Sequence, residues 1–287
     1  MRSLILLLVL IYTSLSFSQD DNDVKGIGQR FFLGVNVGVK FANKNFAARY
    51  AGWYQDQLRT ALSSSNYTNY NAIYQLLGQK DFILPSDLDA FPTKITYTPG
   101  IITGVTLGYK LSPNLQVGLD ADFNKLKVLT GYSIQVIDPS ITVTQAQYRT
   151  GEILAQESRF NGRFNFDYIV EGTGKLNYIF GISGLFHAWR IDSQVAYFDG
   201  YQMPLYSVHN PNNNFTIKTS GIGWGGGLNA GLEYRVNDKI VAQLMYQPYF
   251  VRVDYYNTKS TITSLGSNYV KPPFRLEHDL TVRILWK

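Results

Sequence analysis

The sequence contains no cysteine among its 287 residues. That absence excludes a disulfide framework, a thiolate metal site and a lipid anchor carried on cysteine. Histidine is also scarce, with three residues, and charged residues make up only 16% of the chain. Aromatic residues reach 15% and include 21 tyrosines. This balance is unusual for a protein whose whole surface faces water, and it is typical of aromatic girdles at a membrane interface.

Long apolar runs are almost absent as well. The exception is the N-terminus, where Arg2 precedes an apolar stretch over residues 4–11 and the small-x-small triplet Ser16-Phe17-Ser18. This order is typical of a signal peptide. We expect residues 1–18 to direct Sec export and residues 19–29 to form a segment in the periplasm. No other stretch offers about 20 consecutive apolar residues, so we expect no membrane-spanning helix.

The formal net charge is +5, and it becomes +4 without residues 1–18, because Arg2 is their only charged residue. So small a basic excess does not identify a partner, but it suits a surface rich in lipopolysaccharide. We therefore expect contact with the lipid bilayer and lipopolysaccharide, and none with nucleic acid.

The clearest pattern lies in residues 274–287. One face carries Phe274, Leu276, Leu280, Val282, Ile284 and Trp286, and the other carries Arg275, Glu277, Asp279, Thr281 and Arg283. A period of two indicates a β-strand. An apolar face opposite a charged one, repeated along the chain, favours a strand between lipid and a polar lumen.

Eight segments share this alternation. They are residues 30–41, 95–111, 115–129, 159–170, 176–190, 221–235, 240–253 and 274–287, with boundaries set by turn residues. Three short turns alternate with four long segments, at roughly 42–94, 130–157, 191–219 and 254–272. We predict an all-β fold over residues 30–287, an eight-stranded antiparallel up-and-down transmembrane β-barrel with both termini in the periplasm. A soluble lipocalin-like barrel would need its apolar faces inward, and here the inward faces are polar.

Charged residues of both signs fall on the inward faces. They are Lys40, Lys110, Asp120, Asp122, Arg163, Asp167, Glu233, Arg235, Glu277, Asp279 and Arg283. The interior of an eight-stranded barrel is just wide enough for side chains to fill it, and unpaired charge there is costly. We therefore favour a salt-bridged plug, with a narrow gated channel as the alternative.

The first long segment, residues 42–94, is too long for a linker and predicts a folded, partly helical extracellular loop. Tyr50, Trp53, Tyr54 and Leu58 follow helical spacing over residues 46–62. A second helix is predicted from an N-cap at Asn69 to about Leu77, with Gly78 at its C-terminus. The loop is either a cap on the barrel mouth or a surface that contacts a partner through Tyr50, Trp53, Tyr54 and Leu58.

Catalysis would require a positioned acid–base group. His187 precedes Asp192 and Ser193 near the outer end of a strand, which leaves a rim enzyme acting on lipid or peptide as an alternative function. His278 lies between Glu277 and Asp279 on a lipid-facing position. No nucleophile elbow or metal-ligand spacing is present, so we expect no enzyme, no metal and no cofactor.

Two weaker motifs complete the sequence. Residues 221–226 match G-x-G-x-x-G, but strand alternation continues after them, whereas a dinucleotide site requires a helix there. Tyr197, Tyr201 and Tyr206, near residues 212–214, have the side chains of a sugar-binding surface, although interfacial tyrosine is the commoner explanation.

Three stretches resemble a known family: Ser18-Gln19, Leu33-Gly-Val-Asn-Val-Gly-Val39 and Leu115-Gln-Val-Gly-Leu-Asp120. They are similar to small outer-membrane β-barrel proteins of Bacteroidota, described as an outer membrane protein beta-barrel domain or PorT-type family, with OmpA/OmpX-like architecture. The resemblance covers about residues 30–287. It implies an outer-membrane location, a monomeric barrel and a structural or accessory role beside an envelope protein complex for secretion or uptake. The long helical first loop departs from the plain small-barrel pattern.

Overall fold

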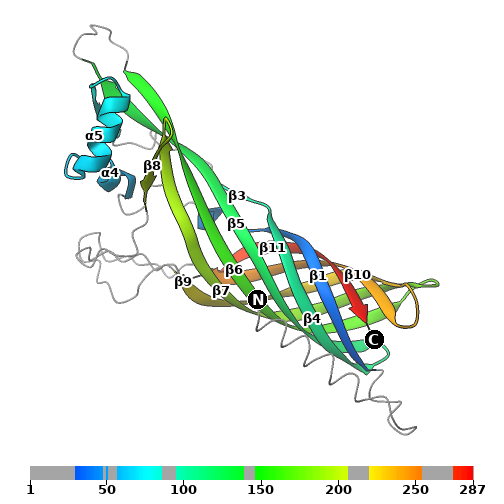
Figure 1. The fold of residues 1–287 in the computed structure, drawn as a ribbon. Coiled ribbons are helices and arrows are strands. Elements are labelled where there is room, and N and C mark those ends of the chain that lie inside the picture. Colours follow the sequence, from blue (N-terminus) through cyan, green and yellow to red (C-terminus); the bar gives the residue numbers. More distant parts are fainter. Residues whose placement is uncertain are drawn as a thin grey trace, which may run out of the picture.

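The computed structural model describes residues 30–47, 50, 57–85, 95–138, 146–205, 220–253 and 274–286, so the predictions for residues 1–18 and 19–29 lie outside the described part. Eight long strands form a closed antiparallel ring (Figure 1). In chain order they are β1 (Phe31–Phe41), β4 (Gly100–Ser112), β5 (Leu115–Ile137), β6 (Gln147–Glu171), β7 (Leu176–Phe198), β9 (Ser220–Arg235), β10 (Ile240–Val253) and β11 (Arg275–Trp286). Each pairs with the next, and β11 pairs with β1. The predicted barrel is confirmed.

The register is staggered around the ring. Successive paired residues lead from Leu115 on β5, through the other strands, to Ile101 on β4. The neighbouring Ile102 faces Asn124, so the circuit returns to β5 at Lys125, ten residues beyond its start. Such a stagger tilts the strands by roughly 35–45° from the barrel axis and leaves an interior that side chains can fill.

Apolar side chains cover the outward face of the ring. The end with the three short turns, called here the turn end, carries Phe31, Tyr109, Tyr168, Tyr178, Tyr234 and Trp286. The opposite end, called the loop end, carries Phe41, Phe123, Phe160, Phe186, Trp224, Phe250 and Phe274. Exposed aliphatic residues such as Val37, Leu119, Ile182 and Leu228 lie between these girdles. An apolar band between two aromatic girdles is the surface of a membrane-spanning barrel.

Three strands are much longer than the sequence predicts. β5 and β6 stay paired as far as Val136 and Gln147, so residues 130–157 form no long loop. β7 continues past residue 190 and turns back through Asp199 and Gly200, both at positive φ, into the short strand β8 (Tyr201–Pro204). Together β5, β6, β7 and β8 form an extension beyond the loop end of the barrel (Figure 1).

In the extension the apolar and polar faces of the strands are exchanged relative to the barrel. This exchange explains why the predicted boundaries of β5, β6 and β7 were wrong. On β5 the inward face changes from Asp122 and Asn124 to Leu126 and Val128, while the outward face changes from Phe123 to Lys125 and Lys127. The period of two is unbroken, but the apolar side chains move to the other face. Such an inversion is expected where a strand leaves lipid and begins to build an ordinary apolar core in water.

Residues 48–49 and 51–56, within the stretch 46–62 that has helical spacing, lie outside the described residues. The described part of the first long segment forms three short helices. They are α3 (Lys44–Ala47), α4 (Gln57–Ala61) and α5 (Tyr67–Leu76), followed by β2 (Asp81–Ile83) and β3 (Tyr97–Thr98), which both pair with β5. The N-cap of α5 is Asn66, which accepts a hydrogen bond from the Asn69 backbone at 3.5 Å, so the predicted cap is three residues late. Gly78 follows the helix at positive φ, as predicted.

Two apolar clusters hold these elements in place. The mouth cluster packs α3 and Tyr50 into the loop end of the barrel: Phe46, Ala47, Tyr50, Ile95, Tyr97, Leu126, Val128, Ala155, Leu185, Trp189, Ile191, Tyr249, Val251 and Val253. The extension cluster packs α4 and α5 on the extension: Leu58, Ala61, Leu62, Ile73, Leu77, Phe82, Tyr132, Ile134, Ile153, Ala196, Phe198, Met203 and Leu205. Within the described ranges no helix has both the length and the apolarity needed to cross a bilayer.

Polar contacts add to the extension cluster. The Tyr70 hydroxyl donates to Asp81 at 2.8 Å, and this hydrogen bond raises the pKa of Tyr70 above its usual value. The Tyr201 hydroxyl donates to Asn69 at 3.0 Å and ties β8 to α5. Figure 1 shows α4 and α5 beside the extension, far from the turn end. The helices therefore brace the extension, whereas α3 closes the barrel below it.

Candidate functional site

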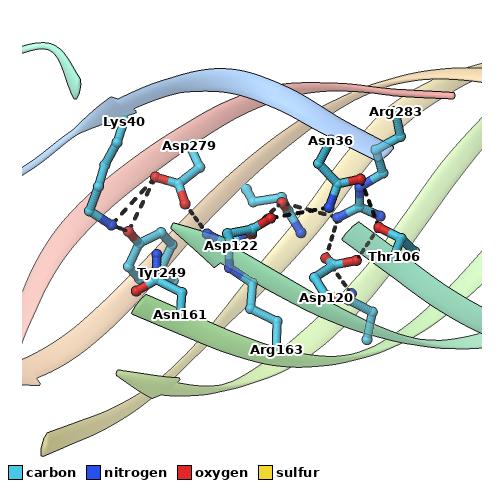
Figure 2. Close-up of polar contacts among 12 residues, drawn as sticks. Asn36, Lys40, Thr106, Asp120, Asp122, Asn161, Arg163, Tyr249, Asp279 and Arg283 are labelled. Atoms are coloured by element: carbon cyan, nitrogen blue, oxygen red, sulfur yellow. Dashed lines mark hydrogen bonds and ion pairs between the residues drawn. The ribbon is translucent and has the colours of Figure 1, made fainter. Parts of the chain in front are cut away.

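Two arginines cross the lumen. β6 and β11 lie four strands apart in either direction round the ring, so they face each other across it. Arg159 on β6 contacts Glu277 on β11 at 2.9 Å, and Arg163 on β6 pairs with Asp279 on β11. Arg163 also donates to Asp122 at 2.9 Å (Figure 2). Because each side chain spans the barrel, the lumen is occupied by the guanidinium groups themselves.

A second set of contacts lies toward the turn end. Asp120 accepts hydrogen bonds from Arg283 at 2.6 Å, from Asn165 at 2.8 Å and from Thr106 at 2.6 Å (Figure 2). Asn36 connects this set to the arginine layer, because its amide nitrogen donates to Asp122 at 3.1 Å. All these side chains are buried.

Lys40 completes the arginine layer. Its ammonium lies 3.1 Å from Glu277 and 3.6 Å from Asp279, and it also donates to the Tyr249 hydroxyl. That hydroxyl lies 3.2 Å from each of the same two carboxylates. One lysine and one tyrosine from strands on either side of β11 therefore hold its two carboxylates in place. Figure 2 shows Lys40 and Tyr249 beside Asp279.

Glu157 joins this network to the mouth cluster. Its carboxylate accepts from the Tyr50 hydroxyl at 2.6 Å and from the Tyr97 hydroxyl at 3.0 Å, and it pairs with Arg159. Glu157 and Tyr50 are fully buried. One buried acid therefore fastens both ends of the first long segment, before α4 and after β2, to an arginine that crosses the lumen.

The structure divides the predicted lumen residues into three groups. Seven lie in the connected network: Lys40, Asp120, Asp122, Arg163, Glu277, Asp279 and Arg283. Asp167 and Glu233 are buried and held by amides, with Asn229 donating to Asp167 at 2.7 Å and Gln243 to Glu233 at 3.0 Å. Lys110 is only half-buried and Arg235 is exposed, so their assignment to the lumen network is corrected. Both lie among the last residues of their strands at the turn end, where a side chain reaches water.

Sequence reasoning missed Glu157, Arg159 and Tyr249. Arg159 shares the strand parity of Arg163 and was available as a signal, but the predicted strand began there and treated it as a boundary. Glu157 fell in a predicted loop. Tyr249 sits on the inward face of β10 between Gln247 and Val251, with no charge to mark it.

The predicted partner contacts are placed differently. Tyr50 and Leu58 are fully buried, in the mouth cluster and the extension cluster respectively, so neither offers a surface to another protein. Trp53 and Tyr54 lie outside the described residues. Among the described helices, the exposed large apolar residues are instead Tyr67 and Leu76, at the two ends of α5. Helical spacing alone did not distinguish the face that packs inward from the face that stays exposed.

The described histidines form no rim site. His187 is fully buried inside the barrel, where Nδ1 lies 2.7 Å from Asn161 Oδ1, whereas Asp192 is on the outer surface and bonds Ser158 and Arg190. His278 faces lipid and stacks on Tyr246. His209 and Tyr206 lie outside the described residues. Within those residues, no three potential metal ligands of the His, Cys, Asp or Glu type cluster together.

The buried charges do not balance. Among the described residues, seven buried carboxylates, counting Glu157, Asp167 and Glu233 with those on β5 and β11, face four buried cations. Amides stabilise two of the carboxylates, and the other five share the cations. Chemically, this arrangement can fasten opposite walls of the barrel together and fill its cross-section. Any water path past it would be lined mainly by acids and would favour cations.

The fold is similar to solved outer-membrane barrels. The Neisserial surface protein A structure covers 90% of this chain and 96% of its own, at 9% identity and a TM-score of 0.42. The match with the outer membrane protein OprG from Pseudomonas aeruginosa covers 90% of this chain and 93% of that chain, at 10% identity and a TM-score of 0.33. The match with LpxR from Salmonella typhimurium covers 87% of this chain and 99% of that chain, at 9% identity and a TM-score of 0.23. No family model and no curated protein matches the sequence.

Proposed function

We propose that the protein is a non-catalytic outer-membrane barrel with a structural or accessory role, which presents its extension to an envelope partner. The observation that carries this proposal is the pair of arginines that cross the lumen beneath a mouth closed by α3 and Tyr50. A barrel filled in this way offers its outer surfaces and its loop end, rather than a pore, as the means of action.

The extension supplies such a surface. It continues from three adjacent barrel strands that run on unbroken, and α4 and α5 brace it through an apolar core. A braced element loses little conformational entropy on binding, which favours recognition. In this proposal the loop end faces out of the cell, the turn end faces the periplasm, and the barrel is monomeric. Its relatives are small outer-membrane barrels of the Bacteroidota, PorT-type group, and the partner is a secretion or uptake complex.

Co-purification tests the partner. We expect the variant Tyr67→Ser/Leu76→Ser to lose an envelope protein that co-purifies with the wild-type barrel from gently solubilised outer membrane. These side chains are 73% and 44% exposed on α5, so the change spares the extension cluster. The matched control is Leu129→Ser/Tyr148→Ser on β5 and β6, where exposure is 60% and 56%. Equal recovery of the partner with all three proteins, or of no partner with any, would contradict docking through α5.

Planar-bilayer recording tests the closed lumen. We expect no steady conductance from the wild-type protein at neutral pH, because two buried ion pairs cross the lumen and the mouth cluster covers it. The variant Lys239→Gln, on the exposed turn between β9 and β10, is the control for preparation artefacts. Reproducible cation-selective unitary currents from both proteins would favour the narrow channel instead.

A further inference from the structure

Basic residues follow the lipid-facing girdle on one side of the barrel. On β5, Phe123 is the last outward aromatic residue, and the next two outward residues are Lys125 and Lys127, both exposed. On β7, Phe186 is followed by Ala188 and then by the exposed Arg190. These positions come where strands leave lipid, because the inward face of β5 turns apolar at the same point. The basic side chains therefore lie at the level of lipid headgroups.

The register brings these residues together. Lys125 is opposite Ser158 on β6, and Ser158 is opposite Arg190 on β7, so all three lie on one rung of the sheet. Neighbouring strands are about 4.8 Å apart, which places the backbones of Lys125 and Arg190 roughly 10 Å from each other. Lys127 occupies the next outward position of β5, opposite Gln156. A group bound over Ser158 is thus within reach of three long basic side chains.

One carboxylate belongs to the same cluster. Asp192 lies 3.2 Å from Arg190 and accepts a hydrogen bond from the Ser158 hydroxyl. It is placed there by the irregular register between β6 and β7 at Gln156 and Glu157. The cluster consequently carries three cations and one anion, and it holds Arg190 on the outer surface in a defined position.

The rest of the loop-end rim differs. On β9 the outward residue after Trp224 is Ile222, and on β11 the last outward residues are Leu276 and Phe274, all exposed and apolar. Arg252 on β10 is a single half-exposed cation beside Trp224. Among the described strands, only the β5–β7 side groups several exposed basic residues at the loop-end rim. Apolar rims contact acyl chains, whereas this side can contact an anionic headgroup.

We propose that Lys125, Lys127 and Arg190 form a binding site for the phosphate of an anionic membrane lipid. The lipid source follows from position, because a headgroup bound here continues directly into acyl chains over Phe123, Phe160 and Phe186. Above the site the outward face of the extension offers Gln156 and Ser193, which suit a large, sugar-based headgroup. The site depends on the membrane-spanning barrel and not on the proposed partner of α5.

Lipid retention in nanodiscs tests the site. The full-length protein is placed in phosphatidylcholine nanodiscs doped with lipid A or with phosphatidylglycerol, and the lipids that stay bound on mild extraction are weighed by native mass spectrometry. Each basic residue near an anionic membrane strengthens binding roughly fivefold. We expect the variant Lys125→Gln/Lys127→Gln/Arg190→Gln to lose at least about tenfold in lipid A retention. Phosphatidylglycerol should be retained less than lipid A by the wild-type protein.

The matched control removes three cations elsewhere. Arg59→Gln/Lys80→Gln/Arg149→Gln changes the net charge equally, but these exposed residues lie on the helical segment and the extension, away from the girdle. It should retain lipid A like the wild type. Equal retention by the two triple variants would overturn the site, and so would displacement of the lipid by inorganic phosphate, which would show a site for free phosphate. Partner co-purification by the first variant reports separately on the proposed function.

Discussion

Arg163→Leu is expected to lower the free energy of unfolding by about 3–5 kcal/mol, because removing one member of a buried ion pair leaves its partners charged and uncompensated. Arg163 is almost fully buried and donates to Asp122 at 2.9 Å, pairs with Asp279 and reaches Gln247 at 3.0 Å. Lys40, which lies 3.6 Å from Asp279, is the remaining cation beside that carboxylate. Urea unfolding in lipid vesicles, followed by tryptophan fluorescence, measures the loss.

A surface ion pair with a similar N–O distance provides the control. Arg149 contacts Asp199 at 2.8 Å, but these side chains are 54% and 43% exposed, against 1% for Arg163 and for Asp122. Arg149→Leu should therefore cost at most about 1 kcal/mol. The double variant Arg163→Leu/Asp122→Leu should regain part of the loss, because one of the stranded carboxylates is removed with its partner. Equal costs for the two arginines would mean that water reaches the lumen freely.

Alternation was enough to predict the barrel because its physical cause is local. Each outward position from Leu115 to Phe123 must meet lipid, and each inward position must meet a polar interior. The surroundings of each residue therefore determine whether it is apolar or polar. The turn at Asn237 was predictable for the same reason, since its side chain caps two backbone amides within three residues, at 2.9 and 2.8 Å.

The extension was missed because its apolar side chains face inward and its polar side chains face outward, the reverse of the barrel. Beyond Phe123 the sequence still alternates, but the medium outside the sheet is water and the inner face packs on helices. The prediction required an apolar outward face, so it ended the strand too early. The Asp199-Gly200 pair was a usable signal, because Asp-Gly suits the left-handed positions of a two-residue hairpin. It marks the end of β7 and the start of β8.

The lumen network shows a different limit. Parity predicted that Lys40, Arg163 and Asp279 face inward, but not which charges meet. That pairing depends on the strand order of the closed ring, which places β6 opposite β11, and on the stagger, which sets the height of each residue along the barrel. Both follow from pairings between segments far apart in the chain. Residues near the strand ends were least predictable, because a shift of two positions decides between lumen and water. Lys110 and Arg235 illustrate this at the turn end.

The attachment of the mouth to the network rests on Glu157, which makes it the sharpest test of whether the closed state is one cooperative unit. Glu157→Ala removes the acceptor of the buried Tyr50 and Tyr97 hydroxyls and leaves Arg159 with Glu277. Each unsatisfied buried group costs about 1–3 kcal/mol. We expect the free energy of local opening to fall by about 3 kcal/mol, so that amide exchange in α3 speeds up roughly 100-fold.

Two variants separate the attachment from the general stability of the barrel. Glu152→Ala changes an exposed acid five residues away on the same strand and should leave amide exchange in α3 unchanged. Tyr50→Phe/Tyr97→Phe keeps the rings of the mouth cluster while removing both hydroxyls, and it should accelerate exchange less than Glu157→Ala, because Arg159 keeps its partner. If Glu157→Ala instead accelerates exchange equally in α3 and in β10, the mouth and barrel unfold together. In that case α3 is an integral layer of the barrel rather than a cap that opens on its own.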